Sequence, residues 1–195
     1  MYSTSINWGH FIAAMHAYGE STRDAAKRNL GSRGRGPNKT WGVTKNRTLQ
    51  KSLQYTLIVE NDGTIRMTLE ATGPARAYGK FVEMGVSGTA TKYDTPFQYT
   101  NKMPPIDSIL EWMNLKPVRL RDLKSGRFVK ATPELKRATA FRIAKAIKRD
   151  GVPPLRFAEE GIEYAREKHR RLLGHAAAMD VMVYMRNNLN EIPKL

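Results

Sequence analysis

The chain has 195 residues, with 33 Lys and Arg against 18 Asp and Glu, no Cys and 41 % hydrophobic residues. This length is enough to bury a core without disulfides or structural metals, and a single domain spanning residues 1–195 is the expectation. The lack of Cys excludes disulfide scaffolds, zinc ribbons, iron–sulfur clusters and thiol catalysis. The formal charge of +15 predicts attraction to a polyanion or to an acidic protein surface.

The N-terminal residues carry neither a basic segment nor a continuous apolar core, so no secretory signal is expected. The most apolar stretch, residues 176–185, is interrupted by Asp180 and Tyr184. It is also shorter than the ~20 apolar residues that a membrane helix needs. We therefore expect a soluble protein with no membrane partner.

Residues 6–30 predict an amphipathic helix, because apolar and small side chains recur at intervals of three and four. Basic residues gather toward its C-terminal end, where cations favour the helix dipole, and Gly31 is a natural stop. The predicted apolar stripe consists of Trp8, Phe11, Ile12, Met15, Tyr18, Thr22, Ala25, Ala26 and Leu30.

Residues 31–47 are rich in Gly and basic residues and show no apolar period, which predicts an exposed loop. Residues 50–71 then give two runs of β-branched and aromatic residues separated by Asn-Asp-Gly, the pattern of a β-hairpin. Alternation defines one apolar face of this hairpin. Its predicted members are Leu53, Tyr55, Leu57 and Val59 on the first strand and Ile65, Met67 and Leu69 on the second.

Two shorter elements follow the hairpin. A short buried element is predicted around residues 78–84 from Tyr78, Phe81, Val82 and Met84. Residues 106–113 predict a helix that begins just after two prolines, where a missing N–H has no cost. Its apolar face contains Ile106, Ile109, Leu110 and Met113.

Residues 134–150 predict a further helix, with Thr132 as its cap, Pro133 as its first residue and Gly151 as its stop. Its predicted buried face is Leu135, Ala138, Phe141, Ala144 and Ile147. The fold class is therefore α+β: a small antiparallel sheet built on the hairpin of residues 53–70, packed against an N-terminal helix and C-terminal helices. We expect the 134–150 helix to cover the sheet together with the N-terminal helix, and Phe141 to lie in the core.

Residues 156–190 predict either one long helix or two, because Gly161 and Gly174 each cost ~1 kcal/mol in a helix interior. A continuous helix of this length would be a rod on the order of 50 Å long. That is longer than a domain of this size covers by itself, so such a helix needs a partner.

The sequence offers no convincing constellation for catalysis or metal binding. Residues 31–36 have the G-x-x-x-x-G spacing, but Pro37 and Asn38 precede Lys39, so the phosphate-loop pattern fails. The four histidines lie six apart within each pair, which places the members of a pair on different helix faces. Glu159 and Glu160 are adjacent and diverge on a helix, and no nucleophile elbow is present. We expect no enzyme, no metal and no cofactor.

Two clusters of basic residues are the candidate contact sites. Their chemistry fits either a sequence-independent phosphate contact with strong salt dependence or docking on an acidic neighbour in an assembly. Trp41 and Phe128 could stack on bases, but the aromatic density of a single-strand platform is missing. The candidate residues are Arg33, Arg35, Lys39, Lys45 and Arg47 in the first loop and Lys116, Arg119, Arg121, Lys124, Arg127 and Lys130 in the second.

Three stretches carry a resemblance to a known family: FVEMG (81–85), PPIDSILEW (104–112) and AFRIAKAIKRDGVPPLRF (140–157). With the N-terminal helix, basic loop and hairpin before them, they resemble the tail-completion, or head-to-tail connector, proteins in the neck of tailed bacteriophages. The resemblance covers most of the chain. It implies a non-enzymatic structural virion protein, assembled in the host cytoplasm, that forms a ring around the DNA channel.

The resemblance also implies the partners. They are other copies of this chain in a ring of twelvefold or sixfold symmetry, portal or adaptor and tail proteins, and double-stranded DNA passing through the centre. Because a ring uses heterologous interfaces, we expect the N-terminal helix face and the hairpin edge to serve different neighbours. The alternative is a nucleic-acid-binding protein that uses its basic loops without reading sequence.

Overall fold

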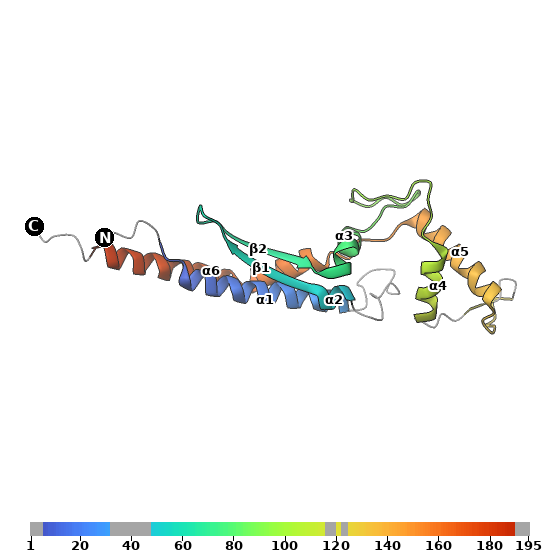
Figure 1. The fold of residues 1–195 in the computed structure, drawn as a ribbon, viewed down its shortest axis with the longest axis horizontal. Helices are drawn as coiled ribbons and strands as arrows, with labels where there is room; N and C mark the ends of the chain where they lie inside the picture. Colours follow the sequence, from blue (N-terminus) through green and yellow to red (C-terminus); the bar gives the residue numbers. More distant parts are fainter. Residues whose placement is uncertain (1–5, 32–47, 116–119, 122–124, 190–195) are drawn as a thin grey trace, which may run out of the picture. The chain divides into compact units, whose positions relative to one another are not determined.

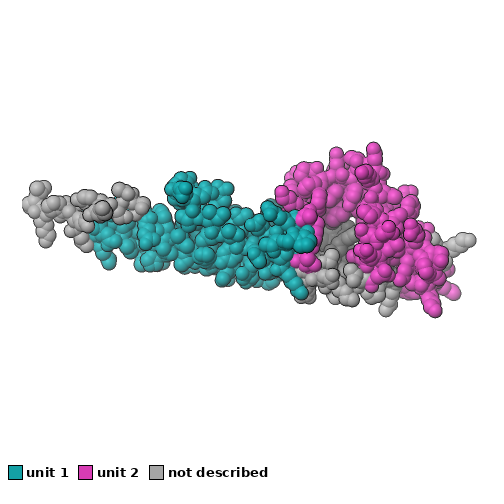
Figure 2. Space-filling model, viewed as in Figure 1, with its two compact units in different colours: residues 1–32, 49–76, 157–195 teal, residues 33–48, 77–156 magenta. Residues whose placement is uncertain are grey.

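The computed structural model describes residues 6–31, 48–115, 120–121 and 125–189. The chain, expected as one domain, divides into two compact units, coloured separately in Figure 2. Unit 1 comprises residues 1–32, 49–76 and 157–195, and unit 2 comprises residues 33–48 and 77–156. The larger segment of unit 2 is therefore inserted between the hairpin and the last helix of unit 1. The α+β class is confirmed.

Unit 1 is built on two long helices, α1 (Gly9–Gly31) and α6 (Phe157–Leu189), which lie side by side (Figure 1). They are antiparallel, because Asn29 donates to the carbonyl of Phe157 at one end and Asp180 contacts His10 at the other. The predicted N-terminal helix is confirmed. The predicted 156–190 region is a single helix of 33 residues.

Small side chains allow α1 and α6 to approach closely. A Cβ built on Gly161 would lie 3.0 Å from the backbone nitrogen of Ala26 and 3.1 Å from the carbonyl oxygen of Thr22. A larger residue at position 161 would therefore push the two backbones apart. The buried small residues of the two helices are Ala14, Gly19, Thr22, Ala25, Ala26, Gly161, Ala165 and Ala176.

Asp180 of α6 caps the N-terminus of α1. Its carboxylate is almost fully buried and accepts from the backbone N–H groups of His10 (3.1 Å) and Phe11 (2.8 Å), and from the His10 ring at 2.6 Å. These backbone groups belong to the first turn of α1, which has no partners for them within the helix. Burial tends to raise the pKa of Asp180, but the hydrogen bonds from Phe11 and His10 outweigh it and lower the pKa below its usual value.

A second polar contact crosses the middle of the helix pair. The hydroxyl of Ser21 and Nε2 of His169 lie 2.7 Å apart, and His169 is buried with its ring edge-on to Tyr18. Burial lowers the pKa of His169, and the neighbouring charge of Lys168 lowers it further. The imidazole is therefore neutral at pH 7 in the folded chain.

The hairpin consists of β1 (Leu53–Val59) and β2 (Ile65–Ala71), which pair antiparallel and follow the short helix α2 (Thr48–Ser52). Its register places Tyr55 opposite Leu69. The Tyr55 ring packs so tightly on α1 that a Cβ at Gly19 would clash with it. The predicted apolar face is confirmed along most of its length, but Val59 at its end is 52 % exposed.

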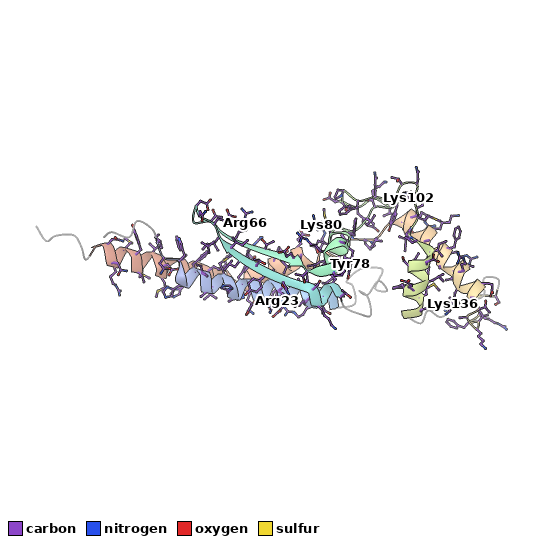
Figure 3. The ribbon with its side chains drawn as sticks, viewed as in Figure 1. Arg23, Arg66, Tyr78, Lys80, Lys102 and Lys136 are labelled. Carbon is purple, nitrogen blue, oxygen red and sulfur yellow. The ribbon has the colours of Figure 1, made fainter. Side chains whose placement is uncertain are left out.

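Unit 2 holds α3 (Arg76–Met84, whose first residue belongs to unit 1), α4 (Ile106–Leu115) and α5 (Pro133–Asp150). The helices α4 and α5 pack together, and Lys136 reaches across to Asn114 (3.1 Å; Figure 3). The helices predicted at 106–113 and 134–150 are confirmed. The core between them consists of Ile109, Met113, Leu120, Ala140, Ala144 and Ile147.

Two sequence predictions about α5 are wrong. Phe141 is 47 % exposed rather than in the core, because the face turned toward α4 carries Ala140, Ala144 and Ile147. The 134–150 helix also does not join α1 in covering the hairpin. It belongs to unit 2 and packs on α4, whereas the helix that pairs with α1 is α6.

The element predicted around residues 78–84 exists as α3, but its burial was misjudged. Phe81 and Met84 are exposed, and Phe81 contacts the ring of Phe97 with centroids 4.4 Å apart. The buried position within α3 is Gly79, and Gly85 directly after the helix is also buried. This pattern indicates that the segment is held by close backbone contacts rather than by large side chains.

A backbone crossing closes unit 2. Val86 and Val152 exchange two N–H to carbonyl hydrogen bonds of 2.8 Å, and Leu155 donates to the carbonyl of Val82 at 3.0 Å. Gly151 has a φ of 74°, and a Cβ on it would clash with the backbone at Val86. Only glycine adopts this positive φ without strain and also leaves room for the backbone at Val86. The crossing therefore fixes the two ends of the inserted unit beside each other.

Within the residues that the structure describes, no helix is both long enough and apolar enough to span a membrane.

The two glycines of α6 test the close helix approach. Gly161→Leu is expected to lower the free energy of unfolding by about 1–3 kcal/mol, because the added side chain meets the α1 backbone. Gly174→Leu is the matched control, since nothing lies within 4 Å of a Cβ there. It is expected to stabilise the chain by about 0.5–1 kcal/mol through helix propensity. Urea unfolding followed by circular dichroism measures both, and equal effects would contradict the packing described.

The exposure of Phe141 is tested by truncating residues on the two faces of α5. Phe141→Ala should change the free energy of unfolding by less than about 0.5 kcal/mol, as at an ordinary surface position. Ile147→Ala should lower it by about 2–5 kcal/mol, because Ile147 is in the core. A loss for Phe141→Ala as large as that for Ile147→Ala in denaturant unfolding would return Phe141 to the core, as predicted from the sequence.

The free energy of unfolding should decrease as the pH drops below about 6.5, because His169 is then protonated more readily in the unfolded chain. Its folded pKa is lowered, so the unfolded chain binds this proton more tightly. The contribution is complete above the unfolded pKa and is lost as the pH falls. His169→Gln should flatten the decrease in Tm between pH 7 and pH 5, while His175→Gln at an exposed position should leave the slope unchanged. Equal slopes in all three proteins would disprove this assignment.

Candidate assembly and polyanion-binding surfaces

The outward face of α5 gathers basic and apolar side chains. The helix begins after Thr132, whose hydroxyl accepts from the N–H of Leu135 (3.3 Å), and stops at Gly151. Since one face packs on α4, the residues at the other helical positions face outward. We call this surface the α5 outer face; it consists of Arg137, Ala138, Phe141, Arg142, Lys145 and Arg149, all exposed.

Two neighbouring hollows meet at Phe141 and Arg142. Their accessible linings are mostly apolar, although basic side chains surround them. The chemistry of this surface therefore favours a partner that offers both negative charge and apolar atoms. The first hollow is completed by Ile106, Glu134, Arg137 and Ala138, and the second, of about 500 Å³, by Thr89, Met103, Lys145, Ala146, Lys148 and Arg149.

Some of these cations already have partners. Arg149 donates to both carboxylate oxygens of Asp150 (2.8 Å each), which raises the pKa of Arg149, and Lys148 donates to the carbonyl of Asn101 (2.9 Å). Among the described residues, no ion pair joins Arg137, Arg142 or Lys145 to a carboxylate. These three side chains are the charges that the α5 outer face offers to another molecule.

Most of the basic loop residues that were predicted as contact sites are not described by the structure. Arg33, Arg35, Lys39, Lys45, Arg47, Lys116, Arg119 and Lys124 lie outside the described residues, as does Trp41. The other three, Arg121, Arg127 and Lys130, are described and exposed. Arg121 lies over the ring of Phe128, 4.4 Å from its centroid. The aromatic side chain expected to stack on bases is thus already in contact with a cation of this chain.

Sequence reasoning missed the α5 outer face. The candidate contact residues predicted from the sequence all lie in the two basic loops, and none lies on α5. The signal was present in the spacing, because positions 138, 141, 142, 145 and 149 fall on one side of a helix once 140, 144 and 147 are buried. Because the predicted buried face of this helix included Ala138 and Phe141, these two residues were not recognised as part of an exposed surface.

Unit 1 leaves apolar side chains uncovered at the C-terminal end of α6. Figure 1 shows α6 continuing beyond the start of α1, which agrees with the contact of Asp180 with the first turn of α1. Past that point Met182, Val183 and Met185 are all exposed, each by 44 % or more. They point in different directions around the helix, and among the described residues no second helix covers this stretch. We call these three residues the α6 end.

The hairpin offers a second, separate apolar surface. Ile58 and Val59 are about half exposed at the end of β1 nearest the turn. Arg66 and Glu60 form an ion pair of 2.9 Å beside them, and Arg66 is labelled in Figure 3. Two uncovered apolar surfaces thus lie on different elements of unit 1.

The N-terminal half of α6 carries an acidic surface. Glu160, Glu163 and Glu167 are exposed and fall on one side of the helix, at intervals of three and four. Tyr164 lies among them, 47 % exposed, with the guanidinium of Arg28 5.3 Å from its ring centroid. None of the three carboxylates forms an ion pair with a described cation. We call these four residues the α6 acidic stripe.

The histidines do not come together as a metal site. His10 and His169 each contact a polar residue across the α1–α6 pair, and His16 contacts the hydroxyl of Tyr55 (3.2 Å). The part of the chain that the structure describes contains no group of three or more His, Asp or Glu side chains able to hold a metal ion. The hydroxyl of Ser21 and the ring of His169 are as close as a catalytic nucleophile and its base. They lie within the packed interface of α1 and α6, however, and we interpret their contact as part of helix packing.

Comparison with known proteins finds no match among family models, curated proteins or solved structures.

Proposed function

We propose that this protein is a structural subunit of a ring-shaped connector, of the kind that joins head to tail in the neck of a tailed bacteriophage and encloses the DNA channel. Its partners are then other copies of the chain in a twelvefold or sixfold ring, portal or adaptor and tail proteins, and the double-stranded DNA that passes through. Its location is the virion. The competing function is sequence-independent nucleic-acid binding by the basic loops.

The observation that carries the proposal is the uncovered α6 end. Met182, Val183 and Met185 are exposed around a helix that its partner α1 no longer covers. Exposed apolar side chains grouped in one place mark interaction surfaces in soluble proteins. The hairpin tip provides a second apolar surface, and a closed ring needs two different surfaces that meet each other.

The arrangement of the segments behind the resemblance also supports a structural role. FVEMG ends α3, PPIDSILEW leads into and forms most of α4, and AFRIAKAIKRDGVPPLRF begins in α5 and runs to the start of α6. The first and third meet in the backbone crossing, and the second packs on the third. Their shared property is therefore packing within unit 2, which is what a scaffold module requires.

The assembly surface is tested on the purified full chain. Native mass spectrometry and negative-stain electron microscopy should show a closed ring of one copy number. The double variant Met182→Lys/Met185→Lys should keep its Tm and reduce self-association by about tenfold or more, because two charges replace the apolar contact. Ala178→Lys, also exposed on α6, is the control and should assemble as wild type.

The location is tested in a lysate of infected cells treated with nuclease and sedimented. Antibody label at a single vertex of DNA-filled particles would support the connector. A wild-type chain that stays monomeric and remains in light fractions, or that nuclease releases from heavier ones, would overturn the proposal in favour of nucleic-acid binding.

A further inference from the structure

The α5 outer face and the α6 acidic stripe are complementary in charge. The first offers Arg137, Arg142 and Lys145, and the second offers Glu160, Glu163 and Glu167. Neither set forms ion pairs with described residues of its own chain. Each surface therefore presents charges that a partner of opposite sign can neutralise.

The two surfaces also match in length and in their apolar content. Residues 137–145 and 160–167 each extend along about 10–12 Å of helix, at 1.5 Å per residue. Phe141 and Tyr164 lie within these stretches, and each is 47 % exposed among the charged side chains. Two helices that pack lengthwise in this region would bring carboxylates to cations and aromatic rings to apolar hollows.

The apolar hollows indicate whether the partner of the α5 outer face is an acidic protein surface or nucleic acid. Duplex phosphates would engage the cations but would leave Phe141 and the apolar linings of the two hollows without a partner. A helix with both carboxylates and an aromatic side chain satisfies both parts of the surface. The α6 acidic stripe is such a helix.

The charge of the whole chain gives a reason for this contact to join copies. At a formal charge of +15, copies of the chain repel one another. A ring therefore needs contacts in which an acidic surface of one copy faces a basic surface of the next. Since the two surfaces are different, the contact is heterologous, and repeated rotation by the same angle closes a ring.

We propose that the α5 outer face of one copy docks on the α6 acidic stripe of the neighbouring copy. The inference rests on the proposed function only in taking the chain to self-associate. It names the two surfaces that meet, and it assigns the basic charge of α5 to a protein contact rather than to DNA.

Charge exchange tests the contact. Arg142→Glu/Lys145→Glu makes both surfaces acidic, and Glu163→Lys/Glu167→Lys makes both basic. Each variant alone should self-associate about tenfold or more weakly than wild type in sedimentation equilibrium, while its Tm is unchanged because all four positions are exposed. Arg76→Glu/Lys80→Glu, at exposed positions outside every proposed contact surface, changes the charge of the chain as much as Arg142→Glu/Lys145→Glu does and should self-associate as wild type.

Mixing the two variants distinguishes a contact between copies from one within a chain. In an equimolar mixture every neighbouring pair can place an acidic surface against a basic one, so association should return to within about threefold of wild type. If the surfaces met within one chain, the mixture would stay dissociated and only the chain carrying all four substitutions would recover. That result would overturn the proposal.

A 30-bp DNA duplex serves as the competing probe, with affinity measured over a series of salt concentrations. Phe141→Ser should weaken self-association about tenfold and leave the duplex affinity unchanged. If the charge-reversed variants associate like wild type but lose affinity for the duplex, the α5 outer face binds nucleic acid and the docking proposal is wrong while the ring stands. A wild-type chain with no self-association would overturn both the docking and the ring.

Discussion

The close antiparallel approach of α1 and α6 is the constraint on which the rest of the structure depends. It requires small residues at the crossing points, of which Gly161 against Ala26 is the tightest. The hairpin packs on α1 through Tyr55 at Gly19, so its position follows from the same helix. Asp180 then fixes the register, because its carboxylate reaches the first turn of α1 only when the helices are aligned as they are. A long helix that is weakly amphipathic by itself is thus held by one partner with matched small residues.

The same constraint explains what unit 1 leaves exposed. Close packing uses small side chains, so the larger apolar and charged residues of α6 point elsewhere: the acidic stripe on its N-terminal half and the α6 end beyond α1. Unit 2 shows the same division. Ala140 and Ala144 of α5 face α4, and Phe141 and the arginines face outward. In both units, a tightly packed inner face is paired with an outer face suited to contacts with other molecules, and this is how a chain rich in charge still builds two ordered units.

Periodicity predicted the elements well and the buried faces less well. The hairpin was located with its apolar face because strict alternation and an Asn-Asp-Gly turn leave one register. The face predicted for α5 was partly wrong: Ala144 and Ile147 are buried as predicted, whereas Ala138 and Phe141 are exposed, and Ala140, which was not in the predicted face, is buried. The close approach of α4 favours small side chains such as those of Ala140 and Ala144. Ala14 and Gly19 of α1 were missed for the same reason. Small residues carry little hydrophobic signal, and their importance appears only when the partner backbone is known.

The charge of the chain shows a related limit. Sequence reasoning counted the basic residues and placed them in loops, where most of them lie outside the described residues. The structure adds the distribution on helices: basic residues exposed on α5 and carboxylates exposed on α6. In a molecule with a net charge of +15, this separation of basic and acidic surfaces matters more for association than the net charge itself. The net charge makes copies repel one another in every orientation, whereas oppositely charged surfaces attract only where they meet. Contacts between such surfaces weaken as salt screens them, whereas the apolar α6 end does not depend on screening. If the chain forms a ring that uses both kinds of contact, the apolar contacts would persist at high ionic strength, and the charged contacts would determine which surfaces of neighbouring copies meet.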